Sequence, residues 1–216
     1  MNVTADSVNL TIEATPGMVI TIEPGVTVSS ANDLPALTIL GAASLVNRGR
    51  VIGSAGKGGS VIAVRQFPRY QMIDATDGGP ALSINAPVSI DNREGIIAGG
   101  GGGGGAAGYE EDMKQFQLFT ANGGNGAGVE AATAGGAEGA AGGLAGAPGK
   151  AGTPGYGYLA GGGGGGWGAN GGDGTSMVSA ITGQGGRGGE AVITNGGSIT
   201  WIGGAESTSR VYGVVR

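Results

Sequence analysis

Few side chains in this chain of 216 residues could carry catalytic chemistry. Histidine and cysteine are absent, which excludes Ser–His and Cys–His nucleophilic catalysis and most zinc sites. The densest carboxylates are Glu110, Glu111 and Asp112. Consecutive side chains rarely converge on one reacting group, so these three are more simply interpreted as a solvated charged face. We therefore expect a protein that is not an enzyme and that uses no cofactor or metal.

Glycine-rich signatures of ligand binding are uninformative in this chain. The pattern G-x-G-x-x-G occurs many times, as a content of 53 glycines alone predicts. The Gly149-Lys150 pair fails as a phosphate loop because Leu144 stands where that motif requires glycine. Gly171–Thr175 resembles a calcium-binding repeat, but it lacks the spacing of that repeat and occurs once.

Charge and hydropathy exclude two further classes of protein. A net charge of −5 gives no electrostatic footprint for nucleic acid. No apolar run approaches the roughly 20 residues that span a bilayer, so we expect a chain that is not inserted in a membrane. Met1–Leu10 shows neither the basic start nor the apolar core of a secretion signal.

Large apolar and aromatic side chains gather in four inserts between glycine tracts: Ala63–Asp77, Tyr109–Thr120, Lys150–Leu159 and Thr175–Thr182. Such side chains do not fit among closely packed glycine backbones, so they must lie outside them, where exposed aromatic groups usually mark a binding surface. The candidate binding residues are Arg65, Phe67, Arg69, Tyr70, Met72, Tyr109, Glu110, Glu111, Met113, Phe116, Leu118, Phe119, Thr153, Tyr156, Tyr158, Ser176, Met177 and Val178.

The alternative is that the inserts fold back as a small core that caps the glycine region. Met113, Phe116 and Phe119 have the i, i+3, i+6 spacing of one helical turn buried against a neighbour. Alanine at Phe116 and Phe119 separates the two hypotheses. A binding role predicts lost binding with nearly unchanged thermal stability, whereas capping predicts lost stability with binding retained.

The elements that position the inserts are glycine tracts between Gly95 and Gly189, including the unbroken runs Gly99–Gly105 and Gly161–Gly166. Such tracts are usually flexible linkers, but serine is nearly absent here and an apolar strand pattern follows. The physical alternative is a block of extended threefold helices that satisfy each other's backbone N–H and C=O groups, which only residues without Cβ allow. If the chain also reverses near Val129–Thr133 and Trp167–Asn170, all four inserts lie at one end of this block.

A repeat indicates what lies beside the glycine block. Segments that begin at Ala36 and Ala81 lie 45 residues apart and match through polar as well as apolar positions. The matched residues are Leu37 with Leu82, Ile39 with Ile84, Ser44 with Ser89, Asn47-Arg48 with Asn92-Arg93, and Ile52 with Ile97. A weaker third copy runs from Ile193 to Ile199 and ends at Trp201. Together with the alternating pattern of Val8–Val28, these copies predict stacked β rungs.

Two motifs resemble a known family: NREGIIAGGGGGGGAAGY at Asn92–Tyr109 and GGGGGGWGANGGDG at Gly161–Gly174. With NRGRVIGSAGKGG at Asn47–Gly59 and SRVYGVVR at Ser209–Arg216, they are similar to the receptor-binding adhesins at the tip of T-even-like phage long tail fibres. The resemblance covers about Thr38 to Arg216. It implies a sandwich of polyglycine II helices that displays variable segments, here the four inserts, to outer-membrane proteins of the host.

The resemblance also implies partners and a location. A bacterial outer-membrane protein or surface glycan is the expected receptor for the candidate binding residues, and the phage tail-fibre protein is the expected partner at the base. The expected location is the distal tip of a tail fibre of the virion, outside the host cell, as a monomeric tip domain. T-even-like adhesins carry a sizeable N-terminal docking domain, whereas about 35 residues precede the first repeat here. We therefore expect the tip domain of a longer tail protein or a shorter relative from another phage type.

The fold class that these observations predict is non-classical and almost entirely β, with almost no α-helix. It combines a small β-helix-like base of rungs with a sandwich of packed polyglycine II helices that has loops at one end. The expected division is residues 1–52 for the base, 53–205 for the sandwich, with the rung 81–97 returning to the base, and 206–216 for a C-terminal strand or tail. The competing hypothesis is a structural glycine-rich module, such as a wall, silk-like or antifreeze protein, although antifreeze modules usually lack long aromatic inserts.

Overall fold

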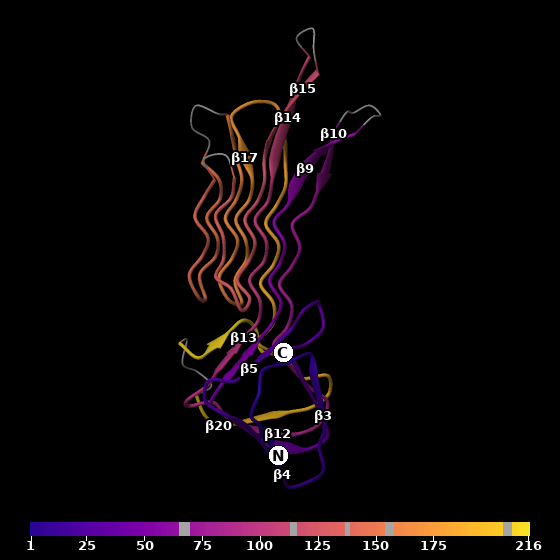
Figure 1. Cartoon of the computed structure of the whole chain (residues 1–216), viewed down its shortest axis with the longest axis vertical. Coiled ribbons are helices and arrows are strands. Elements are labelled where there is room, and N and C mark those ends of the chain that lie inside the picture. Colours follow the sequence, from indigo (N-terminus) through magenta and orange to yellow (C-terminus); the bar gives the residue numbers. More distant parts are fainter. Residues whose placement is uncertain (65–69, 113–115, 137–138, 154–157, 205–208) are drawn as a thin grey trace. The chain divides into compact units, whose positions relative to one another are not determined.

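The computed structural model describes residues 1–64, 70–112, 116–136, 139–153, 158–204 and 209–216, with the backbone alone at residues 111, 112 and 116. These residues form strands and extended segments without any helix (Figure 1), which confirms the all-β fold class. No helix in the described part of the chain is therefore long and apolar enough to cross a membrane. The chain divides into two compact units, each built from separate stretches. Unit 1 is Met1–Ser54, Gly79–Gly100 and Gly189–Arg216, and unit 2 is Ala55–Gly78 and Gly101–Gly188.

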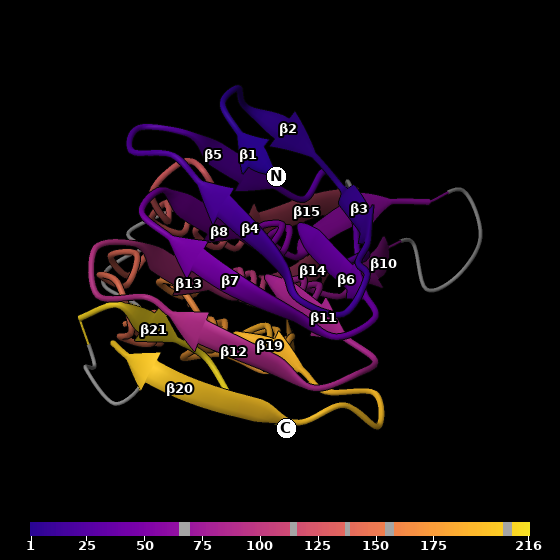
Figure 2. The same cartoon turned by 90° about the horizontal axis from the view of Figure 1, so that it is seen from below.

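Unit 1 is a stack of parallel strands with three faces. Face 1 consists of β3 (Leu10–Glu13), β6 (Leu37–Leu40), β11 (Leu82–Ile84) and β19 (Val192–Ile193). Face 2 consists of β1 (Asn2–Val3), β4 (Met18–Ile22), β7 (Ala43–Asn47), β12 (Val88–Asp91) and β20 (Ile199–Gly203). Face 3 consists of β2 (Ser7–Val8), β5 (Thr27–Ser29), β8 (Arg50–Ile52), β13 (Ile96–Ala98) and β21 (Val211–Tyr212). Successive strands belong to successive faces, and Figure 2 shows β4, β7, β12 and β20 of face 2 side by side.

The core of unit 1 follows from alternation along each strand. In β7 the burial alternates between buried and half-buried residues, so every second side chain points inward. The inward side chains of consecutive turns form one buried cluster, which includes Ile39, Leu45, Val51, Ile84, Ile90 and Ile97. Burial of each side chain of this size contributes roughly 1.5–3 kcal/mol relative to exposure. Short turns link the faces; at Gly41, with a φ of +105°, a Cβ would lie 2.3 Å from the Ala14 carbonyl oxygen.

Polar side chains also stack from turn to turn inside unit 1. Ser89 Oγ donates to Ser44 Oγ at 2.8 Å. The buried Asn47 Nδ2 donates to Asn92 Oδ1 at 2.7 Å, and Asn92 Nδ2 donates to the Arg210 carbonyl at 3.2 Å. Among the described residues Asn47 Oδ1 has no hydrogen-bond partner. The polar matches of the repeat therefore form a ladder that fixes the register of adjacent turns.

The strand register confirms most of the predicted repeat. Leu37 pairs with Leu82, Ile39 with Ile84 and Ser44 with Ser89. The third copy stacks on the second, since β20 pairs with β12 and β19 with β11. The predicted match of Ile52 with Ile97 is wrong by one residue, because Ile52 pairs with Ala98. The corner after Asn92 holds one residue more than the corner after Asn47, which shifts the following strand.

Most of unit 2 consists of extended glycine-rich segments linked by lateral hydrogen bonds. We call residues 101–105 the central segment, because its backbone bonds to six others. These neighbours lie within residues 55–59, 74–78, 122–128, 160–166, 169–174 and 183–188. The bonding repeats every three residues: Gly101 and Gly104 both bond to 122–128 and 55–59, and Gly102 and Gly105 both bond to 160–166 and 169–174. Figure 1 shows the segments of unit 2 running side by side.

The packing of the neighbouring segments leaves no room for side chains on the central segment. A Cβ at Gly102 would lie 2.0 Å from the Gly186 carbonyl oxygen, and a Cβ at Gly103 would lie 1.9 Å from the Lys57 carbonyl oxygen. Real Cβ contacts are essentially never shorter than 3.0 Å. The three-residue period and the close approach are the features expected of threefold glycine helices that satisfy each other's backbone groups. We call this arrangement of the central segment and its six neighbours the glycine lattice.

The strands of unit 2 continue the glycine segments. Antiparallel pairs are formed by β9 (Ser60–Ala63) with β10 (Tyr70–Ile73), β14 (Ala107–Asp112) with β15 (Phe116–Ala121) and with β18 (Ile181–Thr182), and β16 (Leu159–Ala160) with β17 (Thr175–Ser176). The helical turn considered for Met113, Phe116 and Phe119 is wrong, because the second and third of these residues lie on β15; Met113 lies outside the described residues. Cross-strand pairing, rather than helical spacing, brings the large side chains of this insert together.

Candidate binding surface

The strands of the first, second and fourth inserts, with residues 158–159 of the third, lie at one end of the glycine lattice in unit 2, which we call the insert end (Figure 1). Residues 74–77 of the first insert and 150–153 of the third run beside the glycine segments. Strand pairing links the inserts to each other. β14 of the second insert pairs with β18 of the fourth, and β16 beside the third pairs with β17 of the fourth. The first insert joins them because its strand β10 pairs with β9, and β9 lies next to β15. Segments separated by many residues in the sequence thus form one continuous surface.

A small core holds the base of the insert end together. Ala107, Ala121 and Leu159 are buried, and Tyr109 and Phe119 pack against them. Tyr109 and Phe119 are directly opposite on β14 and β15, and their rings stack with centroids 4.9 Å apart and an interplanar angle of 11°. Such a pair contributes about 0.5–1.5 kcal/mol beyond its buried area. Phe119 therefore has a packing role, and alanine there is expected to lower stability as well as any binding.

An exposed apolar patch formed by Tyr158, Met177 and Val178 lies above this core. The side chains of Tyr158 and Met177 are 50% and 68% exposed. The backbone of Tyr158 has a φ of +59°, which bulky residues rarely adopt. Met177 N donates to the Tyr158 carbonyl at 2.9 Å, which ties the two residues to each other. A strained backbone of this kind costs of the order of 1–3 kcal/mol and is found preferentially at functional sites.

The hairpin of β9 and β10 displays a second apolar pair. Tyr70 and Met72 are half-buried, on the same face as the buried Val61, whereas Ile62 and Ile73 are exposed on the other face. Neither isoleucine is among the candidate binding residues predicted from the sequence. The alternation of exposed and more buried residues along the two strands is the signal that identifies these isoleucines. This alternation can be used only when the position of the hairpin turn is known, and the sequence does not give that position.

The remaining candidates fall into three groups. Glu110 and Leu118 face each other across the hairpin and are half-buried, Ser176 is half-buried, and Thr153 is exposed. Glu111 and Phe116 lie on β14 and β15, where the backbone alone is described. The candidates outside the described residues are Arg65, Phe67, Arg69, Met113 and Tyr156.

No group of three or more Asp or Glu residues in the described ranges is placed to hold a metal ion. The hydrogen bond from Arg93 Nε to Asp91 Oδ1, at 2.9 Å, holds the pKa of Asp91 below its usual value. Both residues belong to unit 1, where they stabilise a corner of the strand stack.

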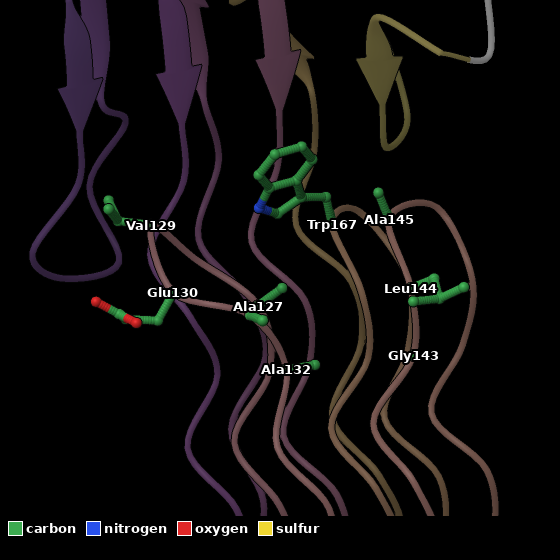
Figure 3. A pocket seen from close by; sticks show the side chains of 9 residues that line it. Ala127, Val129, Glu130, Ala132, Gly143, Leu144, Ala145 and Trp167 are labelled. Atoms are coloured by element: carbon green, nitrogen blue, oxygen red, sulfur yellow. The ribbon is translucent and has the colours of Figure 1, made fainter.

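Two hollows lie in unit 2: the first lies away from the insert end, and the second is lined in part by Asp74 and Asp77 of the first insert and by Thr182 of the fourth. One has a volume of about 280 Å³ and is lined mainly by apolar side chains, with Trp167, Leu144 and Val129 at its rim (Figure 3). Trp167 Nε1 donates to the Gly128 carbonyl at 2.7 Å, so the indole closes the turns at the opposite end of the lattice. The other is a polar groove of about 540 Å³ beside Asp77 and Arg187.

Comparison with known proteins gives one match. A family model described as "Phage tail fibre adhesin Gp38" matches residues 1–215. No curated protein and no solved structure matches the sequence. The matched range includes the strand stack of unit 1, the glycine lattice and all four inserts.

Proposed function

Because the chain belongs to the phage tail fibre adhesin family, we propose that it binds a receptor on the bacterial outer membrane through the insert end of unit 2. In this proposal the glycine lattice is a polyglycine II sandwich that holds the receptor-binding loops in fixed positions. Membership of this family supports an adhesive rather than a catalytic role. It also supports a location on a tail fibre of the virion, where the protein acts outside the host cell. We propose the distal tip as its position on the fibre.

The observation that carries the proposal is that all four inserts contribute to one end of a lattice whose central segment is bonded to its neighbours through backbone groups. The central segment bonds to its neighbours through N–H and C=O groups, so insert side chains can change without altering these bonds. Thr76 and Asp77 of the first insert are exceptions at the outer segments, since their side chains accept from Lys57 N and Arg187 N. Binding residues are found disproportionately on loops that a rigid scaffold positions. A protein that must match different receptors benefits from this separation of fold and specificity.

We propose Tyr158, Met177, Val178, Ile62 and Ile73 as the apolar contacts among the described residues. Aromatic side chains often dominate binding energy when a partner desolvates them, and the strained Tyr158 is held in place by its bond to Met177. The other candidates, including Arg65, Phe67, Arg69, Tyr70, Met113 and Tyr156, remain proposals for the rest of the same surface.

Cell binding by the purified protein tests this assignment. We expect the double variant Tyr158→Ala, Met177→Ala to bind host cells at least 10-fold more weakly, with nearly unchanged thermal stability, since both side chains are exposed. Leu144→Ala is the matched control, because Leu144 is 82% exposed at the opposite end of the lattice. Equal binding by the double variant and the control would contradict the assignment. Bacterial strains that each lack one outer-membrane protein then identify the receptor.

Attachment to the tail-fibre protein is proposed for unit 1. Among the described strands, its first two, β1 and β2, each pair with one neighbour only, so one side of each has no described strand beside it. The side chain of Val8, which lies on β2, is 59% exposed. We expect Val8→Asp to reduce co-purification with the distal tail-fibre protein. Ile202→Asp, at a residue 60% exposed on the last strand of face 2, is the control at the other end of the stack, and loss in both variants would argue against this site.

A further inference from the structure

The hairpin of β14 and β15 presents an open strand edge. Figure 1 shows it reaching farther from the glycine segments than the other strands of unit 2. β18 pairs with β14 only at Ala107 and Gly108. Beyond them Tyr109–Asp112 pairs with β15 alone, and no other described strand covers this edge. The chain that precedes β18 bends at residues 177–179, so no described strand lies beside Tyr109–Asp112 on this edge.

The register shows which backbone groups the edge offers. Gly183 N donates to the Ala106 carbonyl at 2.8 Å, so the backbone groups of residue 106 point towards the β18 side. Groups on successive residues of a strand alternate in direction. The N–H and C=O of Glu110 therefore point outward on the same side, while those of Tyr109 and Glu111 point towards β15. A strand added in line with β18 would find an unused donor and acceptor at Glu110.

The negative charge near this edge indicates which kind of strand could pair with it. Glu110 is the first of three consecutive acidic residues in the sequence, and it lies on the opposite face of the strand from Tyr109. A second copy of the chain would bring like charges together, which is unfavourable directly across a strand pair. An extended segment with basic side chains would pair them favourably. Since successive side chains alternate between faces, apolar residues of the same segment would lie on the face of the Tyr109 and Phe119 rings.

We propose that the outer edge of β14 binds an extended peptide segment of the receptor, with alternating basic and apolar residues, by strand addition. The inference rests on the proposed function and specifies how part of the same surface recognises its partner. Main-chain hydrogen bonds to Glu110 supply affinity, and the Glu110 carboxylate and the stacked rings supply specificity.

A synthetic peptide that alternates lysine with valine is the probe. We expect it to bind the full chain and to slow amide hydrogen exchange at Glu110. Glu110→Pro removes the outward N–H and retains the bonds between β14 and β15, since proline is tolerated where the N–H of an edge strand faces solvent. We expect this variant to bind the peptide at least 10-fold more weakly. The same peptide with glutamate in place of lysine should not bind.

Thr120→Pro is the matched control. Thr120 lies opposite Gly108, so its N–H points away from β14 on the other edge of the hairpin. We expect this variant to bind the peptide within twofold of the unaltered protein. Equal peptide affinity of Glu110→Pro and Thr120→Pro, or no slowing of exchange at Glu110, would overturn strand addition.

Cell binding separates this inference from the function on which it rests. If the unaltered protein binds host cells and Glu110→Pro binds them equally well, strand addition is wrong and the adhesin function stands. If the unaltered protein binds no bacterial strain, the proposed function fails, while the peptide measurements still decide whether the edge accepts a strand.

Discussion

Replacing Gly103 by alanine tests the glycine lattice most directly. The new Cβ would lie 1.9 Å from the Lys57 carbonyl oxygen and 2.4 Å from its carbonyl carbon, both backbone atoms that cannot rotate away. The neighbouring segment would have to move by roughly 1 Å or more, in an interior as tightly packed as a crystal. That shift strains the bonds of Gly103 N to Thr76 O (2.9 Å) and of Gly186 N to Gly103 O (2.7 Å).

The expected cost combines these effects. Overpacking typically costs about 1–3 kcal/mol, and each lost hydrogen bond about 0.5–1.5 kcal/mol. Reduced freedom of the unfolded chain returns about 0.4–1 kcal/mol. We expect Gly103→Ala to destabilise unit 2 by about 3 kcal/mol, which corresponds to roughly 6–12 °C in Tm for a chain of this size.

Calorimetry with a second glycine variant provides the control. At Gly136 the nearest atoms to a new Cβ lie at 3.6 Å, an ordinary contact. We expect Gly136→Ala to leave Tm unchanged or to raise it slightly. If Gly103→Ala unfolds at the same temperature as Gly136→Ala, the lattice is not packed as described. Amide exchange of residues 101–105 at the rate of a free peptide would refute it independently.

Two further predictions concern unit 1. Asn92→Ala removes the acceptor for Asn47 Nδ2 and the donor to the Arg210 carbonyl, so we expect urea denaturation to show a loss of about 1–3 kcal/mol. Because its folded pKa is lowered by Arg93, Asp91 stabilises the protein above its unfolded pKa and loses this effect as pH falls through the folded value. We expect Asp91→Asn to lower Tm slightly at pH 7, since Arg93 is exposed, and not at all once the pH lies below the folded pKa of Asp91; a Tm difference that does not shrink as the pH falls would contradict this.

The strand stack could be predicted from sequence where polar residues repeat. Ser44 and Ser89 match because their side chains bond directly between turns, and that constraint is visible as identity at equal spacing. The shift of Ile52 onto Ala98 could not be predicted, because Val51 and Ile52 are interchangeable in hydrophobicity and the extra corner residue leaves no pattern of its own.

The insert end shows a different limit. Spacing within one segment suggested a helical turn through Phe116 and Phe119, whereas the partner of Phe119 is Tyr109 on the opposite strand. Cross-strand contacts depend on where a hairpin turns, and apolar spacing alone does not give that position. The positive φ of Tyr158 could not be predicted from the sequence either, because backbone strain is set by the surroundings of a residue and not by its type.

The enclosure of the central segment has a consequence for folding. Gly101 bonds to Gly56 near the start of unit 2, and Gly103 bonds to Gly186 near its end. Pairings between residues so far apart in sequence slow folding, because loop-closure entropy must be lost before the contacts form. We expect the N-terminal turns of the stack to form while the chain is still being synthesised. We expect the glycine lattice to form only after nearly the whole polypeptide has been synthesised, and to assemble in one cooperative step.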